Sequence, residues 1–153
     1  MKLAILSDTH GLLRPQVLEH LKTADVILHG GDINKQSVVD ELQRYAPLYV
    51  VRGNNDKEWA DKIPHDLTIN LGGLNFFMVH NKKDVPASLP NVDVVVFGHS
   101  HKYLQEEKNG MLWLNPGSCG PRRFHQEITM MIADVSAGKI KVKKVTIPHS
   151  ENR

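Results

Sequence analysis

The chain has 153 residues, of which 41% are hydrophobic, and its 19 basic and 17 acidic side chains give a formal net charge of +2. This length and apolar content fit one globular domain over residues 1–153. The near balance of charge argues against a nucleic-acid groove and against adhesion to a membrane.

Strands and helices alternate in the first half of the chain. Residues 2–6, 26–28 and 48–51 form apolar runs typical of buried strands. Residues 14–22 and 36–46 place apolar side chains at helical spacing, and Pro47 ends the second helix. This βαβαβ order predicts parallel strands with right-handed crossovers. Ser7 and Asp8 interrupt the first apolar run too early for a signal peptide or a membrane span.

Three hairpins and one central strand are predicted after residue 65. Gly72-Gly73 connects residues 67–71 to 74–79, and Asn109-Gly110 connects residues 103–107 to 111–114. Ala137-Gly138 connects residues 127–134 to 139–147. The continuous apolar run at residues 92–97 predicts a fully buried strand. We therefore expect one α/β domain whose second half is rich in antiparallel strands.

Polar clusters follow five of the predicted strands, at the point where each hydrophobic run ends. They are Asp8-Thr9-His10, Gly31-Asp32, Gly53-Asn54-Asn55-Asp56, Val79-His80 and Gly98-His99-Ser100-His101. Polar side chains at the ends of buried strands are how α/β sheets build active sites. Buried Asp and His are costly unless they are paired or bound to metal, so the pattern favours a metal site over core packing.

The spacing of these residues suits a pair of divalent metal ions. Residues i and i+2 of an extended backbone point to the same side, so Asp8 with His10, and His99 with His101, can each converge on one point. Asp32, Asn54 and His80 complete a set of seven nitrogen and oxygen ligands without a thiolate. Seven ligands exceed what one hydrolytic metal takes but suit two ions that share a carboxylate. Such ligands suit Mn²⁺, Fe²⁺ or Zn²⁺ and argue against a structural Cys-type zinc site or a calcium site. Mn²⁺ is the expected metal, and Ni²⁺ is a further candidate.

At these residues the chain resembles the calcineurin-like metallophosphoesterases. The family pattern is D-x-H, G-D, G-N-x-[DE], an isolated His and G-H-x-H, and all five elements occur here in order. Residues 115–118, Asn-Pro-Gly-Ser, match a further element of the small phosphodiesterase subgroup. The resemblance implies a four-layer α/β/β/α sandwich in which two mixed β-sheets are flanked by helices.

The resemblance also implies a ligand set and a reaction. One ion is held by the residues at Asp8, His10, Asp32 and His101, and the other by those at Asp32, Asn54, His80 and His99. Asp32, Asn54 and His80 are the expected catalytic residues. Two ions about 3.5–4 Å apart bind a bridging hydroxide and direct it at phosphorus. A small phosphodiester is therefore the expected substrate, and a homodimer or homotetramer is the family-level expectation.

Two positions depart from the family pattern. Many members have His where this chain has Asn55, and that His is credited with protonating the leaving group. General acid catalysis is worth about 10²–10⁴-fold, so Asn55 predicts slow turnover of alkyl esters and better rates on activated aryl diesters. Asn81 replaces the Gly that usually follows the ligand His, and Asn tolerates left-handed backbone angles.

Several neighbouring residues have competing interpretations. Arg52, Arg122 and Arg123 are the basic residues nearest the motifs and can bind phosphate, although solvent exposure is the default for arginine. Asp56 either orients a ligand imidazole or only forms a turn. His29 and Cys119 are interpreted as structural, and residues 115–118 as shaping the backbone beside the metals. The remaining histidines are predicted to be surface residues: His20, His65, His125 and His149.

Other functions stay open within the same fold. A phosphomonoesterase or a protein phosphatase has the same ligands, although family protein phosphatases are considerably longer. A retromer subunit of this fold is a protein-interaction scaffold with an impaired metal site, whereas this chain retains all seven ligands. The single cysteine cannot form an internal disulfide and favours a cytoplasmic location.

Overall fold

The structure, a computed structural model, describes residues 1–122 and 126–148. The predicted βαβαβ unit is present at its start. Its elements are β1 (Lys2–Leu6), α1 (Pro15–Leu21), β2 (Val26–His29), α2 (Gln36–Gln43) and β3 (Leu48–Val50). A 3₁₀ turn, η1 (Glu58–Ala60), then leads to the second half of the chain.

The second half supplies seven strands. They are β4 (Asp66–Leu71), β5 (Leu74–Val79), β6 (Val94–Val96), β7 (Leu104–Lys108), β8 (Met111–Asn115), β9 (Ile128–Ser136) and β10 (Lys139–Ile147), with a 3₁₀ turn, η2 (Lys82–Asp84), after β5. All three predicted hairpins are confirmed, because β4–β5, β7–β8 and β9–β10 are antiparallel pairs that turn at the predicted residues.

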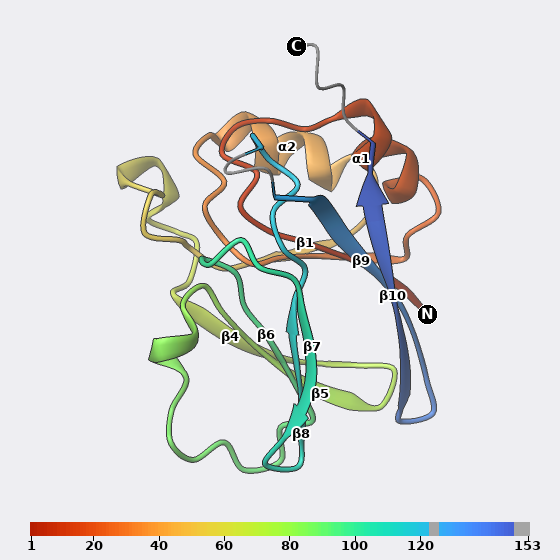
Figure 1. Cartoon of the computed structure of the whole chain (residues 1–153). Coiled ribbons are helices and arrows are strands. Elements are labelled where there is room, and N and C mark those ends of the chain that lie inside the picture. The colour runs from red at the N-terminus through yellow and green to blue at the C-terminus, as the bar shows by residue number, and fades with distance from the viewer. Residues whose placement is uncertain (123–125, 149–153) are drawn as a thin grey trace.

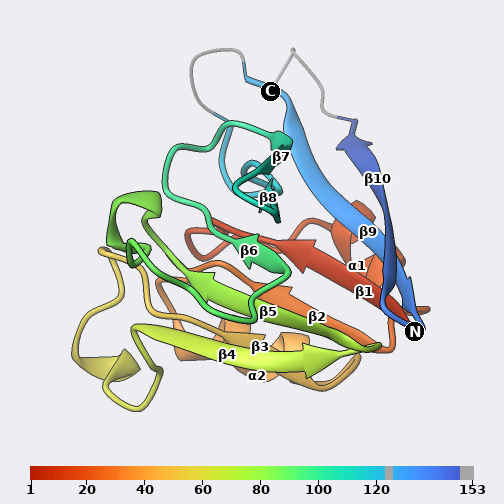
Figure 2. The same cartoon turned by 90° about the horizontal axis from the view of Figure 1, so that it is seen from below.

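The first sheet has the strand order β10-β9-β1-β2-β3 (Figures 1 and 2). Strands β1, β2 and β3 are parallel, as the βαβαβ pattern predicts, with Leu6 opposite His29 and His29 opposite Val50. The C-terminal hairpin joins this sheet through antiparallel pairing of β9 with β1. Three parallel strands therefore end at the same edge, next to the loops that carry Asp8, Asp32 and Asn54.

The second sheet has the order β4-β5-β6-β8-β7 and is mixed (Figure 2). Strand β6 is central, as its continuous apolar sequence predicts, and it pairs in parallel with both β5 and β8. These parallel pairs are a finding of the structure, since the sequence indicates mainly hairpins here. The loops after β5 and β6 carry His80 and His99.

Three hydrophobic clusters hold the layers together. Both helices pack on the outer face of the first sheet through residues such as Val17, Leu21 and Leu42 (Figure 1). The two sheets face each other across a core that includes Leu3, Leu28 and Phe76. The sandwich implied by the family resemblance is therefore confirmed, with an outer layer on the second sheet that differs from the first: residues 82–93, with the 3₁₀ turn η2, cover it in place of an α-helix.

Some element boundaries differ from the sequence expectations for local reasons. Helix α2 ends at Gln43 rather than at residue 46, because Arg44 and Tyr45 donate to the carbonyls three residues before them and tighten the last turn. Helix α1 begins at Pro15, a favoured first helical residue. No helix in residues 1–122 and 126–148 is long and apolar enough to cross a membrane.

Candidate metal centre

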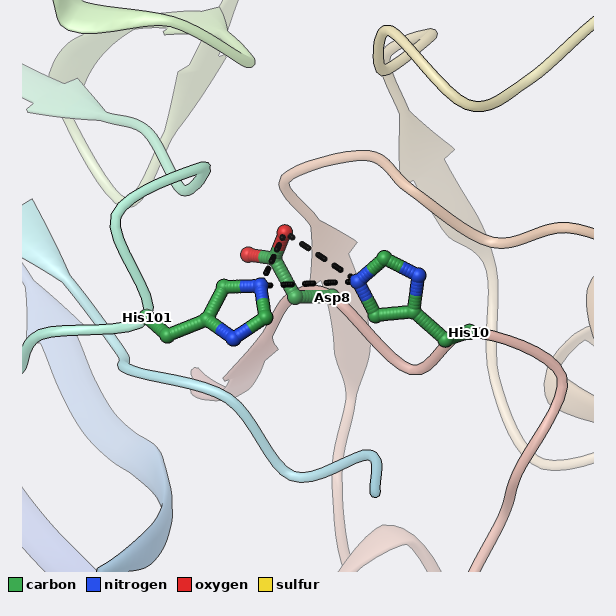
Figure 3. A group of neighbouring side chains, drawn as sticks. All are labelled: Asp8, His10 and His101. Carbon is green, nitrogen blue, oxygen red and sulfur yellow. Dashed lines mark hydrogen bonds and ion pairs between the residues drawn. The ribbon is translucent and has the colours of Figure 1, made fainter. Parts of the chain in front are cut away.

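One group of candidate ligands consists of Asp8, His10 and His101 (Figure 3). The Nε2 atom of His101 lies 3.4 Å from Oδ1 of Asp8, and the Nε2 atom of His10 lies 3.9 Å from the same oxygen. The two Nε2 atoms are 3.4 Å apart. The imidazoles approach one carboxylate oxygen from opposite sides, which is an arrangement that can hold a cation.

A second group consists of Asp8, Asp32 and His80, all buried. The Nε2 atom of His80 is 3.3 Å from Oδ2 of Asp32 and 3.9 Å from Oδ1 of Asp8. His10 Nε2 is also 3.9 Å from Asp32 Oδ2, so the two groups adjoin each other.

Asn54 and His99 lie beside the second group. The Nδ1 atom of His99 is 3.3 Å from Oδ1 of Asn54, and its ring centroid is 5.3 Å from that of His80. The backbone N–H of His99 donates to Oδ2 of Asp8 over 3.1 Å. The fold therefore places all seven residues that the sequence predicts as ligands in one connected cluster.

Two buried atoms in this cluster have no hydrogen-bond partner in the described part of the chain: Oδ1 of Asp8 and Nε2 of His80. His80 Nδ1 lies 2.7 Å from the carbonyl oxygen of Gly30, so Nδ1 carries a proton and, in the neutral ring, Nε2 presents a lone pair to the carboxylates. Facing lone pairs repel each other unless a cation lies between them. A divalent metal satisfies both atoms, and the residues present fit it.

The pKa values of the second group reflect the same demand for positive charge. Burial opposes ionisation of Asp32, but His80 and the backbone N–H of Asn55 lower the pKa of its carboxyl to about 2. Burial likewise opposes the charged form of His80, yet the carboxylates of Asp32 and Asp8 outweigh it and raise the pKa of this imidazole. In the metal-free protein, protonation of His80 therefore supplies the positive charge that the two carboxylates favour.

The candidate ligands have unusual backbone conformations. Nine non-glycine residues in the described ranges have positive φ angles, and five of them are candidate ligands: Asp8, His10, Asp32, His99 and His101. The left-handed region costs non-glycine residues free energy, so such residues persist only where the surrounding structure fixes them. This concentration is typical of a functional site.

Ser7 is a positioning residue that the sequence interpretation missed. Its hydroxyl donates to Oδ2 of Asp8 over 2.7 Å, which satisfies this oxygen and leaves Oδ1 for the cation. Gly98 makes the contact possible, because a Cβ there would overlap the Ser7 hydroxyl. The signal that could have identified it is a hydroxyl residue directly after the apolar strand and directly before Asp8.

Asp56 orients two ligand loops at once. Its buried carboxylate accepts hydrogen bonds of 2.8–3.2 Å from four backbone N–H groups, those of Asp32, Ile33, Asn34 and Gly53. Of the two roles that the sequence allowed, the structure shows the turn: the N–H of Asp56 donates to the carbonyl of Gly53 over 3.1 Å, and no imidazole among the described residues contacts the carboxylate. Asp56 also ties the Asp32 loop to this turn, which carries Asn54.

His29 has the structural role predicted for it, between two ligand loops. Its Nδ1 accepts the N–H of Gly31, so the proton is on Nε2, which lies 3.0 Å from the Thr9 hydroxyl. Complete burial lowers the pKa of His29 to about 4 and keeps the ring neutral. Its hydrogen bonds connect the loop after β1 to the loop after β2.

The remaining predicted residues have the following positions. The amide of Asn55 donates to Asp32 over 3.2 Å. Asn115 holds the carbonyl of Gly98, and Ser118 donates to the carbonyl of Asp8, so the Asn-Pro-Gly-Ser turn shapes the backbone of the site as predicted. Arg122 donates to the carbonyl of Gln126. Three residues named in the sequence predictions lie outside the described ranges: Arg123, His125 and His149.

Comparison with known families decides what kind of protein carries this site. A sequence profile of the calcineurin-like phosphoesterase superfamily domain matches residues 1–138. The chain belongs to this superfamily. It is 28% identical to a phosphodiesterase of Methanocaldococcus jannaschii over 141 aligned residues, which cover 78% of this chain and 84% of the relative.

Solved structures share the fold of this superfamily member. A solved structure of an archaeal phosphodiesterase superposes with a TM-score of 0.79 at 24% identity, and the match covers 96% of this chain and all of that one. A zinc complex of Vps29 from Entamoeba histolytica superposes with a TM-score of 0.74 at 23% identity, with 95% and 99% of the two chains covered. At these identities the superpositions establish the fold, and the activity has to be inferred from the residues of the site.

Proposed function

We propose that this protein is a phosphodiesterase that uses two divalent metal ions to hydrolyse a P–O bond. The observation that carries the proposal is the pair of adjoining ligand groups around Asp8, with two buried ligand atoms that lack a partner. Membership of the superfamily and likeness to a named phosphodiesterase support the reaction class.

The seven residues divide into two ligand sets. Following the family resemblance, Asp8, His10, Asp32 and His101 would hold one ion, and Asp32, Asn54, His80 and His99 would hold the other. Asp32 would contribute to both sets, and its low pKa keeps it ionised across the physiological range. When bound, the ions supply an activated water for attack on phosphorus and neutralise charge on the phosphoryl oxygens.

Asn55 limits the substrates that this site can cleave. Its amide and its backbone N–H both donate to Asp32, so it supports a ligand rather than the leaving group. An amide cannot supply a proton, which favours leaving groups that depart as stable anions. We therefore expect aryl diesters to be cleaved faster than alkyl diesters.

We also propose a cytoplasmic location, because the single cysteine cannot form an internal disulfide.

The test is hydrolysis of bis(4-nitrophenyl) phosphate by protein stripped of metal and reloaded with Mn²⁺, Fe²⁺, Zn²⁺ or Ni²⁺. We expect the highest rate with Mn²⁺, and a loss of at least about 10³-fold in the Asp32→Ala variant, because the shared ligand is gone. Asp40→Ala, an exposed carboxylate on α2, is the matched control and should retain full activity.

A monoesterase would instead favour 4-nitrophenyl phosphate over the diester under the same conditions. Residual activity in Asp32→Ala equal to that of the wild type would trace the hydrolysis to a contaminant. Absence of turnover with every metal would overturn the proposal.

A further inference from the structure

A pocket of about 680 Å³ adjoins the candidate metal centre. His99 lines the pocket and also belongs to the ligand cluster, so the pocket and the centre are continuous. The other walls come from the segments that follow β5, β6 and the β8 strand, which are parallel to one another. Small-molecule sites of α/β proteins lie at such strand ends, and this volume is in their usual range.

Residues 82–93, which cover the outer face of the second sheet, contribute Lys82 and Lys83 to the pocket. Its floor is the buried ring of Phe97, which packs edge-on against Trp113 at a centroid distance of 6.3 Å. Tyr103 and Leu104 add apolar wall at the start of β7. These walls suit an apolar body larger than a methyl group.

Three lysines surround this apolar space, and no carboxylate lines it. The ammonium of Lys82 lies 5.8 Å from the ring centroid of Phe97 and 5.5 Å from that of Trp113, so its charge is held over the aromatic floor. Lys83 and Lys102 are exposed, and no carboxylate in residues 1–122 and 126–148 forms an ion pair with either. Their positive charge is therefore available to a ligand.

A second pocket beside His101 shares Lys102 and Tyr103 with the first and has a different character. It measures about 300 Å³ and contains the ion pair of Lys144 with Glu127 at 2.8 Å. Glu127 neutralises Lys144 there and places a carboxylate against a bound anion, whereas no carboxylate lines the first pocket. A phosphodiester has two ester arms, and an anionic arm fits the lysine-lined pocket rather than this one.

We propose that the pocket beside His99 binds one ester arm of the substrate, and that this arm has a large apolar body and carries a second anionic group such as a phosphate. The inference rests on the proposed phosphodiesterase function and adds the substrate class. The apolar floor contacts the body of the arm, and Lys83 and Lys102 attract its additional charge.

Three substrates with the same 4-nitrophenol leaving group test the proposal. They are methyl 4-nitrophenyl phosphate, thymidine 5′-(4-nitrophenyl phosphate), and the latter compound with a 3′-phosphate. We expect KM to fall in this order, with the 3′-phosphate lowering it about three- to tenfold, as expected for one or two exposed charge pairs. Added salt should reduce the effect of the 3′-phosphate, because it screens these charges.

The Lys83→Gln/Lys102→Gln double variant identifies the lysines responsible. It should raise KM for the 3′-phosphorylated ester about three- to tenfold and leave KM for the methyl ester unchanged. Lys139→Gln, at the exposed start of β10, is the matched control. Calorimetric binding of thymidine 3′,5′-bisphosphate gives a readout independent of turnover and should weaken by the same factor in the double variant only.

Failure of the inference is distinct from failure of the proposed function. If all three esters are cleaved with equal KM, and the double variant changes neither KM nor binding of the bisphosphate, the pocket is not a substrate site although the enzyme is a phosphodiesterase. If none of the esters is cleaved with any metal, the proposed function falls and the subsite falls with it.

Discussion

The two oxygens of the Asp8 carboxylate have different surroundings, and this difference prepares the site for a cation. Oδ2 accepts hydrogen bonds from Ser7 and from the backbone of His99, whereas buried Oδ1 has none in the described part of the chain. Hydrogen bonds to one oxygen fix the rotamer and aim the other. Ser7 thereby acts on the metal through Asp8.

Replacing Ser7 by alanine should weaken metal binding without removing a ligand. Loss of the 2.7 Å hydrogen bond leaves Asp8 less firmly oriented, and supporting hydrogen bonds of this kind are worth about 10–100-fold in metal affinity. We expect a Mn²⁺ dissociation constant raised by this factor in calorimetric titration. Ser88→Ala, in an exposed loop, is the control; an unchanged dissociation constant in Ser7→Ala would refute the role.

At the scale of elements, the candidate ligands of the first sheet lie on loops, and hydrogen bonds between these loops fix their relative positions. The loops after β2 and β3 have no regular pairing with each other, and Asp56 bonds the backbone of both. His29 does the same for the loops after β1 and β2. These two buried polar side chains thus hold together the loops that follow β1, β2 and β3.

The Asp56→Asn variant tests this support. Asparagine keeps the shape but has one acceptor oxygen and no charge, so several of the four backbone donors lose a strong acceptor. Hydrogen bonds to charged groups contribute about 1.5–3 kcal/mol each, and we expect a loss of about 2–4 kcal/mol in the free energy of unfolding of the metal-free protein. Urea denaturation measures it, with exposed Asp61→Asn as control. A loss below about 0.5 kcal/mol would show that these loops hold their conformation without Asp56.

At the scale of the whole molecule, the centre lies where the two sheets meet. The first sheet supplies Asp8, His10 and Asp32, while His80, His99 and His101 follow strands of the second. A bound ion therefore joins the two sheets and stabilises the folded state. At a metal concentration of 100 times the dissociation constant, this stabilisation amounts to about 2.7 kcal/mol.

The stabilisation by metal should increase with pH. In the metal-free protein the raised pKa of His80 adds stability that is present below the unfolded value of 6.5 and is lost as pH rises through the folded pKa. Metal replaces that proton, so the loaded protein does not lose this contribution. We expect the difference in Tm between Mn²⁺-loaded and EDTA-treated protein to grow from pH 5.5 to pH 8. His65, whose pKa its exposed partners Asp66 and Asp84 raise, contributes equally to both forms and cancels. A difference that is constant or largest at acid pH would contradict this expectation.

The amino-acid sequence by itself determined which residues gather at the site and how the first half folds. Asp8, Asp32 and His80 are recognisable because each follows an apolar run with at most three residues between, and the end of such a run is visible in the local sequence. The βαβαβ order and the three hairpins are likewise local, since a turn dipeptide or a helix of known spacing joins neighbouring strands.

Only the tertiary structure decided how these pieces combine. Three features depend on which apolar faces pack together: the parallel pairing of β5, β6 and β8, the addition of β9 and β10 to the first sheet, and the packing of residues 82–93 on the outer face of the second sheet. The hydrogen bonds of Asp56 to Asp32 and of His29 to Thr9 join residues 24 and 20 positions apart. Sequence spacing carries no signal for such contacts, because they arise only when separate strand ends are brought side by side.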